Sequence, residues 1–104
     1  MRLMTRPTPH SPTDAKRLIE QIVEQGSVLL SAHCKRDSMP LRGVTFADLL
    51  HVLTHGQIAQ APVWDSQHQN WKYHVAGFDL DGDQLTAITV IIESDFTVRV
   101  LTVF

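Results

Sequence analysis

The last third of the chain, WKYHVAGFDLDGDQLTAITVIIESDFTVRVLTVF from Trp71 to Phe104, decides the fold. It contains three runs rich in β-branched and aromatic residues, separated by two short polar breaks, Asp81-Gly82 and Ser94-Asp95. Apolar runs bounded by turn residues predict strands, so this stretch predicts a three-stranded antiparallel meander. Asp-Gly between such runs favours a tight hairpin, because both central residues of a type I′ turn need positive φ.

Two-residue turns in both hairpins would fix which side chains share a face of the meander. On that register Trp71, Tyr73 and Arg99 lie on one face, whereas Lys72, His74 and Thr102 lie on the other. A slip of one residue in either hairpin exchanges neighbours across the sheet. Both faces are largely apolar, so we expect each of them to be partly covered.

Two helices are predicted upstream of the meander. Ser11-Pro12-Thr13-Asp14 is typical of a helix start, and Gly26 is typical of a helix end. Between them, apolar residues recur at helical spacing and form one stripe that needs a packing partner. The second helix starts at Thr45, which forms an approximate capping box with Asp48, and it ends at Gly56.

The segment between these helices is predicted with less regular structure. Ser27–Ala32 reads either as an edge strand or as an extended connector, and His33–Met39 reads as a short helical segment stopped by Pro40. These elements together predict an α+β fold, with two or three helices packed on a small antiparallel sheet. Residues 1–10 are expected to form a leader, and residues 11–104 a single domain.

Composition narrows the class of protein. No apolar run approaches the roughly 20 residues that span a bilayer, and the N-terminus has no apolar core typical of a signal peptide. The single cysteine, Cys34, fits a reducing cytoplasm, so we expect a cytoplasmic protein without a membrane segment. The formal net charge of −2 argues against binding nucleic acid through overall charge. Any RNA binding then requires a local basic patch.

Five short motifs carry a family resemblance: Ser31-x-His33, Arg42 to Thr45, His55 to Ile58, Tyr73 to Val75 and Thr102 to Phe104. In this order, over about residues 11 to 104, they resemble the small bacterial domain of unknown function numbered four thousand two hundred fifty-eight. More distantly, Thr8-Pro9-His10, the first helix and the strand that begins at Trp71 are similar to the MqsR mRNA interferase toxins.

The resemblance implies more than the residue patterns do. MqsR and RelE-like toxins belong to a broad group of metal-independent ribonucleases that place helices against a small curved antiparallel sheet. It therefore implies a RelE-like toxin fold, mRNA as substrate, a cognate antitoxin as partner, and no metal or other cofactor.

A ribonuclease of this kind must help deprotonate a ribose 2′-hydroxyl, stabilise charge on the phosphorus and protonate the departing 5′-oxygen. Histidines titrate near working pH, arginine offers a planar two-donor fork to phosphate, and aromatic rings stack on bases. The rings that could stack on a base are those of Tyr73, Trp71 and Trp64. The candidate catalytic residues are His33, Arg36, His74, Tyr73 and Thr102, and the candidate RNA-binding residues are Arg42, Lys72, Arg99 and Trp71.

Each candidate also has a structural explanation. His33 can be a hydrogen-bonding residue near a helix start, and Trp71 and Tyr73 alternate with Val75 as core residues do. Arg99 can pair with Glu93 or Asp95, or lie over the core with its charged head in water.

Three further patterns indicate no separate site. His51 and His55 share a helical face, but the sequence positions no third metal ligand beside them. Asp79-x-Asp81-Gly82-Asp83 lacks the glutamate of a calcium loop and is typical of a hairpin. Cys34 reads as a small buried hydrophobic residue.

Two functional hypotheses follow. The first is a ribonuclease toxin of a toxin-antitoxin pair. The second is a non-catalytic module that binds protein or RNA on the same scaffold, for which the acidic balance is an argument. Asp37 is a second argument for the non-catalytic module, because members of the family often carry arginine at this position, four residues after the histidine.

Overall fold

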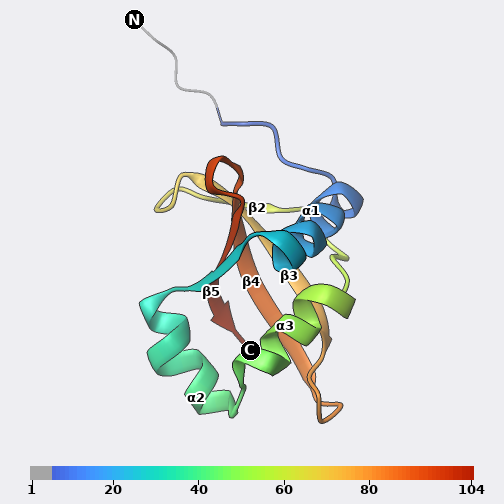
Figure 1. Cartoon of the computed structure of the whole chain (residues 1–104). Helices are drawn as coiled ribbons and strands as arrows, with labels where there is room; N and C mark the ends of the chain where they lie inside the picture. Colours follow the sequence, from blue (N-terminus) through green and yellow to red (C-terminus); the bar gives the residue numbers. More distant parts are fainter. Residues whose placement is uncertain (1–5) are drawn as a thin grey trace, which may run out of the picture.

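Helices and strands form two layers in the computed structural model, which describes residues 6–104 (Figure 1). The predicted α+β fold is confirmed: helices pack on one face of an open sheet of five strands within these residues. The α-helices are α1 (Pro12–Gln25), α2 (Met39–Arg42) and α3 (Phe46–His55). The strands are β1 (Ser27–Leu30), β2 (Val63–Asp65), β3 (Asn70–Phe78), β4 (Gln84–Ile92) and β5 (Thr97–Val103).

Both long helices begin and end as their sequences predict. The Ser11 hydroxyl accepts a hydrogen bond from the backbone N–H of Asp14, 3.1 Å away, and Gly26 follows the last turn of α1. Thr45 and Asp48 form the reciprocal capping box at the start of α3. Each cap satisfies backbone groups that have no partner inside the helix, which is why these short motifs fix the helix ends so well.

The short helical segment does not stop at Pro40, so that prediction is wrong. A π-helical turn, η1 (Cys34–Ser38), runs directly into α2, and Pro40 lies in the first turn of α2. A regular α-helical turn would bring the proline ring against the carbonyl four residues back. The wider π-helical turn, in which the N–H of Met39 donates to the carbonyl of Cys34, relieves this clash. Gly43, at a φ of 65°, ends α2.

The sheet has the strand order β1-β5-β4-β3-β2. The predicted meander β3-β4-β5 is antiparallel, but β1 pairs with β5 in parallel, so the sheet is mixed and not purely antiparallel. The reason lies where β1 begins. Ser27 donates its backbone N–H to the carbonyl of Phe96, directly before β5, so both strands leave the same end of the sheet in the same direction.

The predicted register of the first hairpin is wrong by one residue. Its loop has three residues, Leu80-Asp81-Gly82, instead of two: the N–H of Asp79 donates to the carbonyl of Asp83, and Gly82 has a φ of 86°. Glycine at the left-handed third position is typical of three-residue hairpin loops. Phe78 therefore pairs with Gln84. Each side chain of β3 consequently shares a face with the set of β4 side chains that was expected on the opposite face.

A second irregularity lies in β5. Val90 pairs with Arg99 as predicted, but the register shifts between Ile88 and Thr89, so that Ile88 pairs with Thr102 and Leu101 is the extra residue. Because of the extra residue, the side chains beyond the bulge lie on the opposite face of the sheet from the one that simple alternation predicts. Thr102 consequently shares a face with Arg99.

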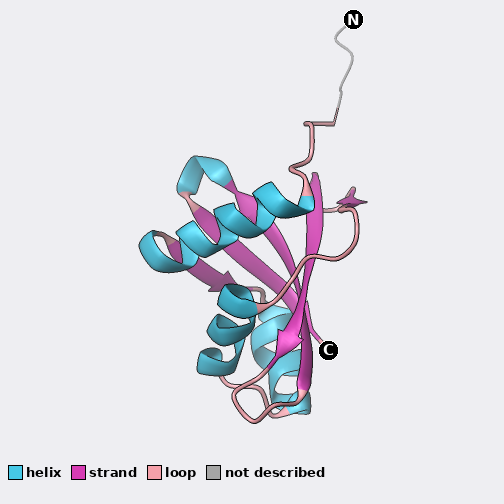
Figure 2. Cartoon of the chain, turned by 90° about the vertical axis from the view of Figure 1, so that its right-hand side faces the viewer, coloured by secondary structure: helices cyan, strands magenta, loops and turns pink. Residues whose placement is uncertain are grey.

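Helices α1 and α3 cover one face of the sheet, and Figure 2 shows both on the same side of it. That face contributes Tyr73, Val75, Leu85, Ala87 and Val100 to the buried core. Within residues 6–104 no helix lies on the other face, contrary to the expectation that both would be partly covered. We call the second face the open face.

Candidate functional site

Four polar residues from β3 and β5 gather on the open face: Lys72, His74, Arg99 and Thr102, here called the quartet. Lys72 and Arg99 are both paired with Val90 of β4, one from each side. His74 and Thr102 are paired in the same way with Ile88. Strands lie about 4.8 Å apart, so each pair is separated by about 10 Å at the backbone. One ligand lying over β4 can therefore contact all four side chains.

Lys72 and Arg99 cover the apolar floor between them. Val90 is only 3% exposed although no helix of residues 6–104 lies over it. We infer that the aliphatic stems of Lys72 and Arg99 shield it, with their charged heads directed to solvent. No ion pair within residues 6–104 joins either head to a carboxylate, so Arg99 does not pair with Glu93 or Asp95. Both charges remain available to an anion.

His74 is half-buried beside Lys72. Burial lowers the pKa of His74 below its ordinary value, and the positive charge of Lys72 lowers that pKa further. Its Nδ1 lies 2.9 Å from Nε2 of Gln60. Gln57 pairs with Ala76 through two backbone hydrogen bonds, so the segment after α3 runs alongside β3 and brings Gln60 to the ring. His74 is accordingly held in one orientation and is neutral at neutral pH.

Tyr73 and Trp71 lie on the covered face, away from the quartet. Tyr73 is 2% exposed, its hydroxyl accepts the backbone N–H of His10, and burial raises its pKa. The indole N–H of Trp71 donates to the carbonyl of Pro7. Tyr73 belongs to the hydrophobic core and Trp71 packs against it, so the alternative interpretation of both as core residues is confirmed. Residues 1–5 of the expected leader lie outside the described residues.

The third aromatic candidate, Trp64, packs edge-on against Trp71 with 5.2 Å between ring centroids. The guanidinium of Arg6 lies 5.0 Å from the centre of its ring. The three rings predicted to stack on bases are therefore occupied by the protein itself.

His33 and Arg36 lie on exposed positions at η1, and no hydrogen bond or ion pair within residues 6–104 connects them with the quartet. Nδ1 of His33 lies 3.3 Å from the carboxylate of Asp37. The buried residues of η1, Cys34 and Ser38, hold this segment against the rest of the fold. Cys34 is buried, burial raises the pKa of its thiol, and the hydroxyl of Ser38 accepts the backbone N–H of Val103.

Arg42 is the candidate from the helical segment that reaches the sheet. Its guanidinium donates to the backbone carbonyl of Gln84, 2.8 Å away, where β4 begins. On α3 the rings of His51 and His55 lie 4.7 Å apart, and within residues 6–104 no cluster of three metal-ligating side chains includes them.

A family model described as "Domain of unknown function (DUF4258)" matches residues 30–104. This chain belongs to the DUF4258 family. The matched region contains η1, α3, the whole meander and therefore the quartet, whereas α1 precedes it. No curated protein and no solved structure matches the chain. Within residues 6–104 no helix is both long and apolar enough to cross a membrane.

Sequence reasoning named all four quartet residues but divided them between two faces. It missed Gln60, which holds His74, because that residue lies in a connection with no periodic pattern. The only signal available was Gly56 before it. A methyl group at Gly56 would lie 2.6 Å from the carbonyl oxygen of Val52, so the connection leaves α3 in close contact with its neighbours.

Proposed function

We propose that this DUF4258 protein binds single-stranded RNA on its open face and cleaves it there, as a metal-independent endoribonuclease of the mRNA interferase type. The observation that carries the proposal is the gathering of Lys72, His74, Arg99 and Thr102 around one apolar floor. Lys72 and Arg99, which form no ion pair within residues 6–104, suit a phosphodiester, and a neutral histidine beside them suits proton transfer.

The proposed reaction is a transesterification. The ribose 2′-hydroxyl gives its proton to His74, and its oxygen forms a bond to the adjacent phosphorus. The bond from phosphorus to the 5′-oxygen breaks, and the ammonium group of Lys72 protonates the departing oxygen. Arg99 and Thr102 hold the non-bridging oxygens, where negative charge grows in the transition state. The products are a 2′,3′-cyclic phosphate and a free 5′-hydroxyl.

Gln60 decides which nitrogen of His74 acts. A side-chain amide can support either ring tautomer, because its nitrogen donates and its oxygen accepts. In the structure the amide nitrogen of Gln60 faces Nδ1, so a neutral His74 accepts a hydrogen bond there and carries its proton on Nε2. For Nε2 to act as the general base, the amide must turn so that its oxygen faces Nδ1, which then carries the proton. The lowered pKa of His74 keeps the ring neutral at neutral pH, which is the form required of the base.

Similarity to the MqsR and RelE-like toxins supports a toxin with mRNA as substrate and an antitoxin as partner in the cytoplasm. In this reading the antitoxin would block the open face. His33, directly before η1, and Arg36, on η1, keep the status of candidate catalytic residues.

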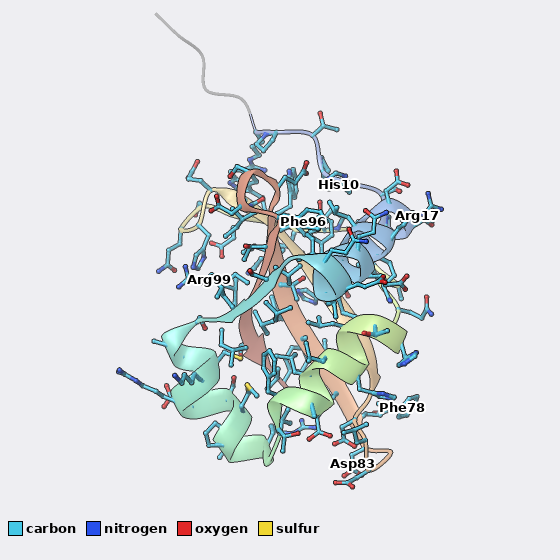
Figure 3. All side chains as sticks on the ribbon, viewed as in Figure 1. His10, Arg17, Phe78, Asp83, Phe96 and Arg99 are labelled. Carbon is cyan, nitrogen blue, oxygen red and sulfur yellow. The ribbon has the colours of Figure 1, made fainter. Side chains whose placement is uncertain are left out.

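The test is an RNA cleavage assay in the presence of EDTA with the wild type, His74→Gln and Arg99→Met. We expect the wild type to release products with a 2′,3′-cyclic phosphate end, and both variants to lose most of this activity. Arg17→Met is the matched control, because Arg17 lies on α1, on the covered side (Figure 3). RNA that stays intact with the wild type, or full activity of His74→Gln, would contradict the proposal.

A second candidate function has an observation of its own. His74 is the one imidazole in the quartet, and the other candidate histidine, His33, contacts Asp37 instead of a quartet residue. A protein that binds RNA without cleaving it needs only the cations. Binding of labelled RNA without cleavage, lost in Arg99→Met and kept in His74→Gln, would favour this second function.

A further inference from the structure

A pocket of about 300 Å³ opens at the hairpin end of the sheet. It is lined by Ala76, Gly77, Phe78, Gln84, Leu85 and Thr86. Ala76 pairs with Thr86 and Phe78 with Gln84, so these pairs form the next two rows of the open face beyond His74 and Ile88. Along β3 the pocket begins two residues, or about 7 Å, from His74.

Phe78 gives this pocket an exposed aromatic wall. Phe78 is 57% exposed as a residue, and it projects near Asp83 at the hairpin end, whereas Arg99 lies farther along the sheet (Figure 3). A ligand that covers this ring would remove apolar surface from water, which favours binding. An aromatic face beside a cationic strip is the arrangement by which proteins hold the unstacked bases of single-stranded nucleic acid.

Gln84 and Thr86 add polar side chains to the pocket. The backbone carbonyl of Gln84 accepts from Arg42, and the backbone of Thr86 pairs with that of Phe104, so these contacts do not use the two side chains. An amide and a hydroxyl both donate and accept, so they can contact the edge of a base that stacks on Phe78.

The charges along the open face orient such a ligand. Lys72 and Arg99 lie at one end of the rows. At the other end the hairpin loop beyond Phe78 carries the carboxylates of Asp79, Asp81 and Asp83, which outnumber the guanidinium of Arg42 at the carbonyl of Gln84. Phosphates are attracted to the first end and repelled from the second. The group that enters the pocket is then an uncharged base and not the phosphate backbone.

We propose that this pocket is a base-binding subsite for the nucleotide next to the phosphate held by the quartet, with Phe78 stacking on the base and Gln84 and Thr86 contacting its edge. The proposal rests on RNA binding at the open face as proposed above, and it adds a source of base preference. Phe78 is a binding residue here and takes no part in proton transfer.

The test measures binding of fluorescent 2′-O-methyl hexanucleotides, which lack the attacking hydroxyl and stay intact. One probe is a mixed-sequence hexamer, and the other is the same backbone with abasic positions. We expect Phe78→Ala to weaken binding of the base-bearing probe by about 5- to 100-fold, the loss typical of one stacked base. Binding of the abasic probe should stay unchanged, and Phe78→Trp should restore the wild-type affinity.

Phe46→Ala is the matched control, since Phe46 is another exposed phenylalanine but lies on α3. Equal affinity of Phe78→Ala and the wild type for the base-bearing probe would overturn the subsite, and so would equal weakening of both probes. A wild type that binds neither probe but forms dimers disrupted by Phe78→Ala would show that a second copy covers this face.

The two proposals fail in different ways. A Phe78 effect on the base-bearing probe, together with RNA that is never cut, supports the subsite and refutes the ribonuclease. Cleavage that continues with unchanged base preference in Phe78→Ala supports the ribonuclease and refutes the subsite.

Discussion

Removing the charges of Lys72 and Arg99 without removing their stems tests the open face most directly. Methionine keeps a flexible apolar chain of similar length, whereas alanine removes chain and charge together. The Lys72→Met, Arg99→Met double variant should therefore keep the floor residue Val90 covered and lose RNA binding. The double alanine variant should lose both.

The size of each effect follows from the geometry. Fully burying a valine side chain stabilises a protein by about 1.5–3 kcal/mol, and Val90 keeps its strand neighbours in either variant. We therefore expect alanine to lower the free energy of unfolding by about 1 kcal/mol relative to methionine. If each cation neutralises one phosphate, the slope of log affinity against log salt should fall by about 0.7 per cation. For the pair that is about 1.4, or roughly sevenfold in affinity between 50 and 200 mM salt.

Two measurements check this reasoning: urea unfolding of both double variants, and RNA binding by the wild type and the methionine variant at several salt concentrations. Equal unfolding midpoints would show that the stems do not shield Val90. An unchanged affinity and salt slope in the methionine variant would refute phosphate binding by Lys72 and Arg99, whatever the unfolding data show.

Four further predictions concern the framework of the site and the environment of His74. Gly56→Ala should lower the free energy of unfolding by about 1–3 kcal/mol in urea denaturation, because the new methyl group would lie within 2.8 Å of two backbone oxygens. Gly43→Asn should cost less than about 1 kcal/mol, since Asn tolerates the left-handed conformation and no atom lies within 4 Å. The pKa of Asp48 is lowered, chiefly by the backbone N–H groups of Thr45 and Leu80, so its stabilising contribution is present above the ordinary pKa and disappears as pH falls through the lowered value. The difference in free energy of unfolding between the wild type and Asp48→Asn should thus be full at pH 7 and should shrink as pH falls below about 4. A difference that does not change with pH would refute this. Finally, Lys72→Met should raise the pKa of His74 in an NMR titration, because the positive charge beside the ring is removed.

Local sequence signals predicted the elements well where one short motif satisfies a local need. The Ser11 cap, the capping box from Thr45 to Asp48 and the closing Gly26 fix helix ends through hydrogen bonds between residues close in sequence. The α+β class followed in the same way, from the helical period upstream and the strand period after Trp71. The membership of the DUF4258 family, first seen as five short motifs, is confirmed over residues 30–104.

The parallel edge strand could not be predicted in this way. Ser27–Leu30 has no feature that distinguishes a parallel from an antiparallel partner, and its direction depends on the contact between Ser27 and Phe96, which are far apart in the sequence. Nor did any local pattern mark Gln60, whose role comes from the path of the chain beside β3.

By itself, the sequence determined which polar residues the strands of the meander offer: Lys72 and His74 with one residue between them, and Arg99 and Thr102 with two. Only the tertiary structure decided that they share one face. One extra loop residue at Leu80–Gly82 and one bulge at Leu101 each shift the pairing by a single position. Because side chains alternate with a period of two, each such shift moves a residue to the opposite side of the sheet. The open face exists because α1 and α3 both pack on the other one.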